Sequence, residues 1–201
     1  IQACVSDSII GRAIENKLIK VNCINIRDFS TNKHKKVDDY PYGGGNGLIM
    51  TTQPIYDAYL SIVKNLEQKP HVVYMSPQGS VLNQQKAKEL MEKKHIIILC
   101  GHYEGVDERI IEEIVDEEIS IGNYVLTGGE IPAAVMIDCI SRMVPGVLAG
   151  EHSYQDESIY GGLLEYPQYT RPPVFNGRPV PEVLISGHHA NIKKWREEQS
   201  K

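Results

Sequence analysis

Apolar positions along the chain switch repeatedly between two spacings. Short apolar runs rich in β-branched residues are typical of strands, and they predict strands at residues 19–26, 71–75, 96–100 and a run that ends at residue 119. Apolar positions three and four residues apart predict helices, at residues 10–18, 55–66, 87–91 and 131–143. Strands that alternate with helices indicate an α/β fold with a mostly parallel sheet and helices on both faces.

Two of these elements are apolar in an unusual way. Residues 96–100 are apolar without alternation, as expected of a central parallel strand that is covered on both faces. Residues 131–143 are apolar on nearly every side of the predicted helix. We therefore expect this helix to be buried or to face a partner subunit.

Three predicted strands end in loops that contain glycine, at residues 74–79, 100–105 and 120–129. Loops that follow parallel strands lie at one edge of the sheet, where α/β proteins bind ligands, so these loops predict a three-walled pocket. Tyr103, Tyr124 and Leu126 would form apolar walls, and no lysine or arginine lies in the loops. Such a pocket suits a ligand held by its base and ribose better than one held by phosphates. Spacing alone leaves a tight crossover without a ligand equally open.

Composition narrows the class of protein. The chain is 41% hydrophobic and 23% charged, which is typical of a soluble globular protein. No apolar run approaches the roughly 18 residues of a membrane helix, and no signal peptide pattern is present, so we expect a cytoplasmic protein without a membrane partner. The four cysteines are far apart in the sequence, which favours reduced thiols over disulfides or a zinc site.

The charge pattern bears on possible ligands. A net charge of −5 argues against binding of nucleic acid through the overall charge of the protein, although residues 33–36 and 188–196 are locally basic. The glycine-rich run at residues 43–47 lacks the Gly-Lys-Ser/Thr ending of a phosphate-binding P-loop. An ATPase is therefore excluded.

Several long motifs follow one another in a fixed order that resembles a known family. They are Asp-Asp-Tyr-Pro-Tyr-Gly-Gly-Gly at 38–45, Ser-Pro-Gln-Gly at 76–79, Cys-Gly-His-Tyr-Glu-Gly-Val-Asp-Glu-Arg at 100–109, residues 120–130, Pro-Gly-Val-Leu at 145–148, Tyr-Thr-Arg-Pro at 169–172 and Ser-Gly-His-His at 186–189. Together they cover nearly the whole chain. The chain resembles the bacterial tRNA (guanine-N1)-methyltransferases, which methylate the guanine 3′ of the anticodon.

The resemblance implies a fold and a cofactor. It implies a deep trefoil knot of the SPOUT class, an exception to the usual rules of chain topology, with S-adenosyl-L-methionine held on the three loops. The residues that match the family's cofactor contacts are Tyr74, Ser76, Gly101, Tyr103, Gly105, Ser120, Ile121, Gly122, Tyr124, Leu126, Gly128 and Gly129. The resemblance also implies a homodimer with a shared active site, which would explain the apolar helix at 131–143.

Methyl transfer to guanine N1 requires that N1 lose its proton and that O6 be stabilised as negative charge develops there. The resemblance implies Arg142 as the donor to O6 and the acid before Ser158 as the base. That acid is Glu157 here, where the family usually has aspartate, and Asp156 is the alternative. Glu104 is a third candidate, expected to position the substrate. Without the resemblance, Arg142 would be read as a surface arginine at a helix end.

Other residues are expected to bind tRNA at its anticodon stem-loop. Asp38 and Asp39 can accept hydrogen bonds from guanine N1–H and N2–H₂, which suits recognition of an unstacked base by its edge. Candidates for contact with the RNA backbone are Arg27, Lys33, Lys35, Arg171, His188, Lys193 and Lys194. The family's reaction is magnesium-dependent, so Mg²⁺ is a possible cofactor, but the sequence shows no metal-ligand cluster and we nominate no site.

Three parts are expected along the chain: a SPOUT methyltransferase domain at 1–148, a linker or lid at 149–163, and the start of a small helical tRNA-binding domain at 164–201. Family members begin with a strand and a Phe-Pro-rich turn and continue further, so we expect the first strand and most of the last domain to lie outside this sequence. Two alternative functions stay open. One is a SPOUT enzyme that methylates a ribose 2′-hydroxyl, and the other is a non-catalytic RNA-binding SPOUT module.

Overall fold

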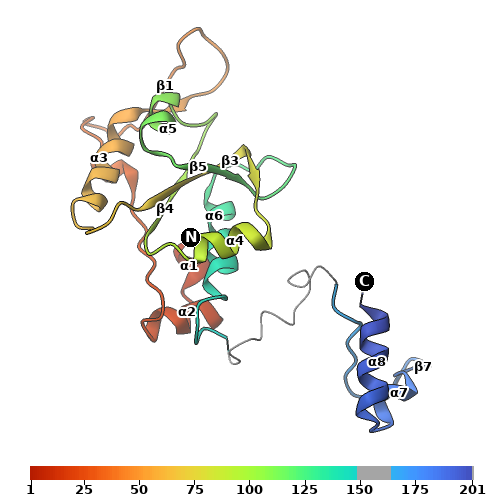
Figure 1. The fold of residues 1–201 in the computed structure, drawn as a ribbon. Coiled ribbons are helices and arrows are strands. Elements are labelled where there is room, and N and C mark those ends of the chain that lie inside the picture. Colours follow the sequence, from red (N-terminus) through yellow and green to blue (C-terminus); the bar gives the residue numbers. More distant parts are fainter. Residues whose placement is uncertain (149–163, 201) are drawn as a thin grey trace. The chain divides into compact units, whose positions relative to one another are not determined.

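The computed structural model of the chain describes residues 1–148 and 164–200. These residues form two compact units, one within 1–149 and the other within 150–201. The first unit contains α1 (Gln2–Val5), α2 (Ser8–Glu15), the 3₁₀ helix η1 (Ile26–Phe29), β1 (Asp38–Asp39), β2 (Ile49–Met50), α3 (Thr52–Val63), β3 (His71–Val81), α4 (Gln84–Met91), β4 (Ile96–Cys100), α5 (Glu108–Ile114), β5 (Glu117–Ser120) and α6 (Glu130–Ser141) (Figure 1). The second contains β6 (Val174–Phe175), β7 (Arg178–Pro179), α7 (Glu182–Ile185) and α8 (His189–Gln199).

The main sheet of the first unit is parallel and has the strand order β4-β3-β5. This confirms an α/β fold with a parallel sheet. The prediction that residues 96–100 form a central strand is wrong, because β3 occupies the centre. The continuous apolar pattern of β4 reflects packing on both faces instead: Leu99 packs on one side of the sheet, and Ile96 and Ile98 on the other.

Helices cover both faces of the sheet, as predicted, because side chains of a strand point alternately to opposite faces. Tyr74 of β3 packs with residues of α3 and α5, whereas Val73 and Met75 pack with residues of α4 and α6. Figure 1 shows these two helix pairs on opposite sides of the sheet. Each large apolar side chain buried in these two clusters stabilises the fold by about 1.5–3 kcal/mol.

Strand β3 is longer than its sequence pattern predicts. The predicted strand ends at residue 75 and is followed by a turn at 76–79, whereas β3 continues to Val81. Both Met75 and Ser80 pair with Ile119 of β5, so the residues between them bulge out of the ladder before the chain pairs with the same strand again. The Leu82 amide then donates to the Ser120 carbonyl at 2.7 Å.

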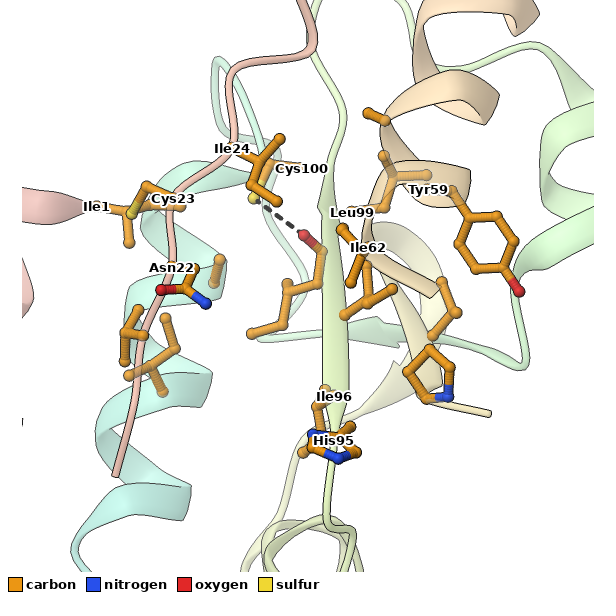
Figure 2. A pocket seen from close by; sticks show the side chains of 18 of the residues that line it. Ile1, Asn22, Cys23, Ile24, Tyr59, Ile62, His95, Ile96, Leu99 and Cys100 are labelled. Carbon is orange, nitrogen blue, oxygen red and sulfur yellow. Dashed lines mark hydrogen bonds between the residues drawn. The ribbon is translucent and has the colours of Figure 1, made fainter. Parts of the chain in front are cut away.

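The strand predicted at residues 19–26 does not form, and a cavity explains why. The segment is extended but unpaired up to η1, and a cavity of about 970 Å³ separates it from the free edge of β4. Figure 2 shows Asn22, Cys23 and Ile24 on one wall of this cavity and Leu99 and Cys100 of β4 on the other. A strand requires a hydrogen-bonded neighbour, and at this separation β4 does not supply one.

Helix α6 buries only part of its surface. Its buried residues are Ala133, Met136 and Ser141, whereas Ile131 is 61% exposed and Val135 is 39% exposed. Of the two predicted alternatives, burial on all sides within this chain is wrong, and contact of the exposed side with a partner subunit stays a prediction. Its apolar residues divide between the core and an open face.

The second unit contains a hairpin (β6 and β7) that the sequence did not predict, followed by α7 and α8. Helix α8 lies in the part of the chain at 164–201 that was expected to be helical. Tyr169 packs against Trp195 with ring centroids 6.4 Å apart, and the Arg196 guanidinium lies 4.8 Å from the centre of the Tyr166 ring. The segment at 166–169 thus lies along α8. Among the residues that the structure describes, no helix has the length and apolar character to cross a membrane.

Candidate active site

Two of the three predicted loops meet at the carboxyl edge of the sheet. The Gly129 amide donates to the Gly101 carbonyl at 2.8 Å, and His102 pairs with Gly128 in an antiparallel bridge. A Cβ atom at Gly129 would lie 2.8 Å from Cα of Cys100, closer than van der Waals contact allows. Only glycine lets the two backbones come this close.

The loop that follows β5 is folded onto itself. The Ser120 hydroxyl accepts from the Gly122 amide at 3.2 Å and donates to the Gly122 carbonyl at 3.1 Å. Gly122 has a φ of +148°, which favours glycine, and a Cβ there would lie 2.6 Å from the Tyr124 ring. The Tyr124 hydroxyl donates to the Ile121 carbonyl at 3.2 Å. Leu126, further along the loop, is 38% exposed.

The loop at 74–79, the first of the three predicted walls, differs from the other two because it begins inside a strand. Tyr74 lies within β3, where it is buried and its ring packs beside Gly101. Burial, and after it the charges of Glu118 and Glu108, raises the pKa of Tyr74, so its hydroxyl stays protonated at neutral pH. Ser76 is buried at the start of the bulge, where its hydroxyl accepts from the Gln78 amide at 3.2 Å.

A short hairpin joins the loop at 100–105 from the other side. The Met50 amide donates to the Gly105 carbonyl at 2.9 Å, and the Glu104 amide donates to the Leu48 carbonyl at 3.0 Å. Met50 also pairs with Asp38 across β1 and β2. Since neighbouring strands lie about 5 Å apart, Asp38 is about 10 Å from the chain that follows Gly105. The structure thus places the Asp38 backbone near the end of the predicted cofactor loop to which Glu104 belongs.

The three acids of this region have different environments. Asp38 is buried, whereas Asp39 and Glu104 are exposed. The Tyr40 amide and then Lys36, whose ammonium is 3.3 Å from the carboxylate, lower the pKa of Asp39. Asp39 is therefore ionised at neutral pH and can accept hydrogen bonds. The side chain of Glu104 lies against Gly47 of the glycine-rich run.

Arg142 does not lie near the predicted cofactor loop at 120–129 of its own chain. Gly129 is the N-cap of α6 and Arg142 is its C-cap. A helix rises 1.5 Å per residue, so about 20 Å separates the two ends. A ligand held on the loops is therefore out of reach of this arginine within one chain.

The remaining predicted residues lie elsewhere. Arg171 and His188 belong to the second unit, where both are exposed. Glu157 and its alternative Asp156 lie outside the described residues. In the part of the chain that the structure describes, no three His, Cys, Asp or Glu side chains come together in a group that could hold a metal ion.

Sequence reasoning missed two side chains beside the loops. His102 packs edge-on against Tyr103, with ring centroids 5.2 Å apart, and its Nδ1 is 3.8 Å from Oε1 of Glu130. Arg27, which we predicted to bind RNA phosphates, donates from Nη2 to the Tyr103 hydroxyl at 2.9 Å. A contact across 76 residues leaves no spacing signal, so only the three-dimensional structure could reveal it.

These features define an α/β protein with a candidate ligand site at the carboxyl edge of a parallel sheet. Comparison with known families identifies it further. The model of the family described as "tRNA (Guanine-1)-methyltransferase TrmD" matches residues 1–201, and the chain belongs to this family of SPOUT methyltransferases. The resemblance of its motifs is thus confirmed.

Relatives with this name are similar over almost the whole chain. The tRNA (guanine-N(1)-)-methyltransferase of Ruminiclostridium cellulolyticum is 67% identical over 196 residues, which cover 98% of this chain and 84% of the relative. Proteins of the same name from Clostridioides difficile and Alkaliphilus oremlandii are 58% and 57% identical. These two matches cover 98% of this chain and 85% and 81% of the relatives.

Proposed function

We propose that this chain transfers a methyl group from S-adenosyl-L-methionine to N1 of the guanine 3′ of the anticodon in tRNA. The observation that carries the proposal is the backbone contact between the loops at 100–105 and 120–129 in a chain of this family. The same two loops are the place where a trefoil knot would close.

The chemistry of the loops fits this cofactor. Gly101, Gly128 and Gly129 let the backbones of the two loops pack closely against their neighbours, and Tyr103, Tyr124 and Leu126 offer partly exposed apolar surface. The absence of lysine and arginine from the loops suits a cofactor without phosphates, whose sulfur carries a positive charge. When bound, S-adenosyl-L-methionine supplies an electrophilic methyl group. The other cofactor contacts that we propose are Tyr74, Ser76, Gly105, Ser120, Ile121 and Gly122.

The acids of the β1–β2 hairpin would recognise the base. Ionised Asp39 can accept a hydrogen bond from guanine N2–H₂, and an adenine offers no donor at that position. Buried Asp38 supports the same edge, and Glu104 positions the base beside the cofactor loop. Arg171 and His188 of the second unit contact the RNA backbone in this proposal.

Proton removal and charge stabilisation complete the reaction. Glu157 takes the proton from N1 and leaves a lone pair there that can accept a methyl group, and Asp156 is the alternative base. Arg142 donates to O6, where negative charge develops as N1 is deprotonated. Mg²⁺ stays a possible cofactor in this proposal, and we nominate no site for it among the described residues. The reaction is cytoplasmic in this proposal, because its substrate is tRNA.

A homodimer with shared active sites reconciles this chemistry with the length of α6. Arg142 is about 20 Å from the loops of its own chain, so the arginine must come from a second subunit. The open apolar surface supports such an interface: Val125 is 81% exposed, Tyr124 55% and Ile131 61%. Monomeric proteins seldom leave such neighbouring apolar side chains uncovered.

The experiment that tests the function incubates the chain with methyl-labelled S-adenosyl-L-methionine and two tRNA transcripts, which carry guanine or adenine 3′ of the anticodon. We expect 1-methylguanosine in digests of the first transcript only. Label on a ribose hydroxyl of both transcripts would instead indicate the 2′-O-methyltransferase. Cofactor binding without transfer to either transcript would indicate the non-catalytic module.

The base is assigned by two matched variants. We expect Glu157→Gln to lower kcat by about a hundredfold or more, and Asp156→Asn by much less, because general base catalysis contributes about 10²–10⁴-fold. Single-turnover rates at saturating cofactor measure the loss in each variant. The reverse order would assign Asp156, and two small losses would exclude both acids.

A further inference from the structure

The Arg27 side chain connects two segments that are distant in sequence. It belongs to η1, whose N-cap Asn25 accepts a hydrogen bond from the Arg27 amide at 3.1 Å. Its guanidinium donates from Nη2 to the Tyr103 hydroxyl at 2.9 Å and from Nη1 to the Lys35 carbonyl at 3.3 Å. The planar guanidinium thus bridges the basic segment at 27–36 and the loop at 100–105.

Tyr103 is a residue whose position needs support. Its φ of +59° lies in the left-handed region, which is unfavourable for a side chain other than glycine. The ring is 42% exposed and contacts His102 only edge-on. The hydrogen bond from Arg27 favours one orientation of this partly exposed side chain.

The geometry distinguishes Arg27 from the lysines near it. Arginine can donate from two nitrogens to two separate acceptors at once, whereas the lysine ammonium is a single flexible point charge. Lys33, in the same basic segment, is exposed at its surface. Lys33 is thus suited to phosphate contact, while Arg27 is already oriented toward the loop.

We propose that Arg27 is a positioning residue, which holds the Tyr103 ring as a wall of the cofactor pocket. This inference rests on the proposed function, because it requires that the loop at 100–105 bind S-adenosyl-L-methionine. Arg27 touches neither the methyl group nor guanine in this proposal. It acts through the Tyr103 hydroxyl alone.

A double-mutant cycle tests the inference. Arg27→Ala, Tyr103→Phe and the double variant are compared in calorimetric titrations with S-adenosyl-L-methionine and in steady-state kinetics. Loss of one exposed hydrogen bond is expected to weaken cofactor binding about fivefold in each single variant. The double variant should be no weaker than the weaker single one, because both remove the same contact. The KM for tRNA should change less than about twofold.

Three further variants separate positioning from other roles. Arg27→Lys keeps the charge but not the planar fork, so it should not restore cofactor affinity. Lys33→Ala should raise the KM for tRNA and leave cofactor binding unchanged. Tyr56→Phe removes a hydroxyl from a ring packed against the core near α3 and should change neither.

Each alternative outcome has a distinct meaning. Additive losses in the cycle, or a defect confined to tRNA binding that Arg27→Lys restores, would show that Arg27 contacts phosphate and would overturn the inference alone. If the unmodified chain does not bind S-adenosyl-L-methionine, the proposed function fails and the inference with it. If Arg27→Ala does not fold, Tyr103→Phe still decides, because unchanged cofactor affinity in that variant contradicts the proposal.

Discussion

Gly129 is a position of the site where a side chain would meet backbone atoms of the neighbouring loop. A Cβ there would lie 2.8 Å from Cα of Cys100 and 3.0 Å from the Gly101 amide nitrogen. Both neighbours are backbone atoms, which cannot rotate away as a flexible side chain would. The contact between the two loops therefore depends on a missing methyl group.

We predict that Gly129→Ala weakens cofactor binding by about tenfold or more and lowers the Tm by several degrees, because overpacking typically costs about 1–3 kcal/mol. Calorimetric titration and thermal unfolding measure the two effects. Gly177→Ala is the control: its Cβ would meet open space, and its φ of +74° adds backbone strain alone. Unchanged cofactor affinity in Gly129→Ala would show that the loops do not form the pocket.

Cys100 precedes the same contact, and its thiol is predicted to be unreactive. Burial, with a smaller effect of the Glu130 charge, raises the pKa of Cys100 to about 12, so the reactive thiolate is scarce at neutral pH. Cys4 and Cys23 are exposed. With iodoacetamide at pH 8, mass spectrometry should show labelling of Cys4 and Cys23 at least about tenfold faster than that of Cys100. All should label in denaturant, and equal rates in the folded chain would refute the prediction.

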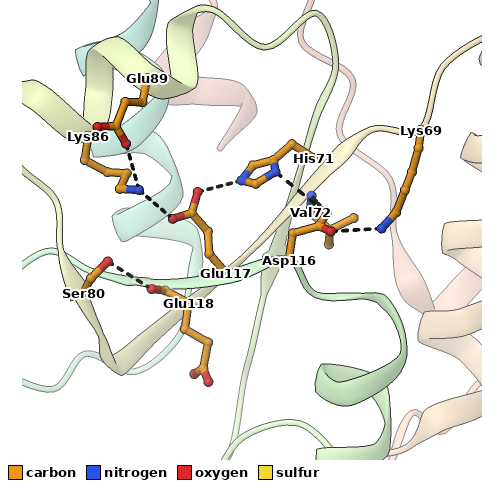
Figure 3. A network of polar contacts seen from close by, with 9 residues as sticks. All are labelled: Lys69, His71, Val72, Ser80, Lys86, Glu89, Asp116, Glu117 and Glu118. Carbon is orange, nitrogen blue, oxygen red and sulfur yellow. Dashed lines mark hydrogen bonds and ion pairs between the residues drawn. The ribbon is translucent and has the colours of Figure 1, made fainter.

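At the scale of elements, polar contacts fix the beginning of β3 against β5. Nε2 of His71 is 2.6 Å from Oε1 of Glu117, and the Lys86 ammonium is 3.0 Å from the other oxygen of the same carboxylate (Figure 3). Next to them, Asp116 accepts from the Val72 amide at 2.8 Å and pairs with Lys69 at 2.9 Å. This network lies at the end of the sheet opposite the loops and holds the register of the two strands.

The network predicts a dependence of stability on pH. Burial alone would raise the pKa of Glu117, but the hydrogen bonds from His71 and Lys86 outweigh it and lower the pKa below its ordinary value. An acid whose pKa is lowered in the folded state adds stability above its ordinary pKa of about 4. That stability is lost as the pH falls through the lowered value.

We therefore expect Glu117→Gln to destabilise the chain by about 1–2 kcal/mol at pH 7, with a Tm lower by a few degrees. The difference from the unmodified chain should begin to shrink below about pH 4, where the carboxyl of the unfolded chain takes up a proton, and should disappear as the pH falls through the lowered pKa of the folded state. Thermal unfolding between pH 3 and pH 8, a range that spans the ordinary pKa of a glutamate, measures the difference in Tm. Glu89→Gln, at the exposed end of the network, should change little, and a constant difference across the range would contradict the argument.

Sequence reasoning succeeded where the cause of an element is local. The run at 96–100 forms β4, and Asn83 caps α4 by accepting from the Lys86 amide at 2.8 Å. It failed where an element depends on a distant partner. The segment at 19–26 has the pattern of a strand but no paired neighbour, and β3 continues past its bulge because β5 offers it a second pairing. Hydrophobic periodicity indicates which residues are buried, but it does not indicate which strand edge is free to pair.

At the scale of the whole molecule, the predicted site is divided. Glycine spacing was sufficient to find the two loops that meet, but the distance from them to Arg142 follows only from the length of α6. A site that needs both the loops and Arg142 must use the arginine of a second subunit. Two inactive variants, each defective in a different half of the site, then provide the test.

We predict that Arg142→Ala and Leu126→Arg are each inactive as homodimers and regain activity when mixed under conditions that exchange subunits. Random exchange makes about half of the dimers mixed, and each mixed dimer has one site with an intact loop and an intact arginine, so about a quarter of the unmodified activity should return. Initial rates of methyl transfer before and after exchange measure the recovery. Each variant exchanged with itself is the control. If the mixture stays inactive although mass spectrometry shows mixed dimers, each active site is complete within one chain and the shared site is wrong.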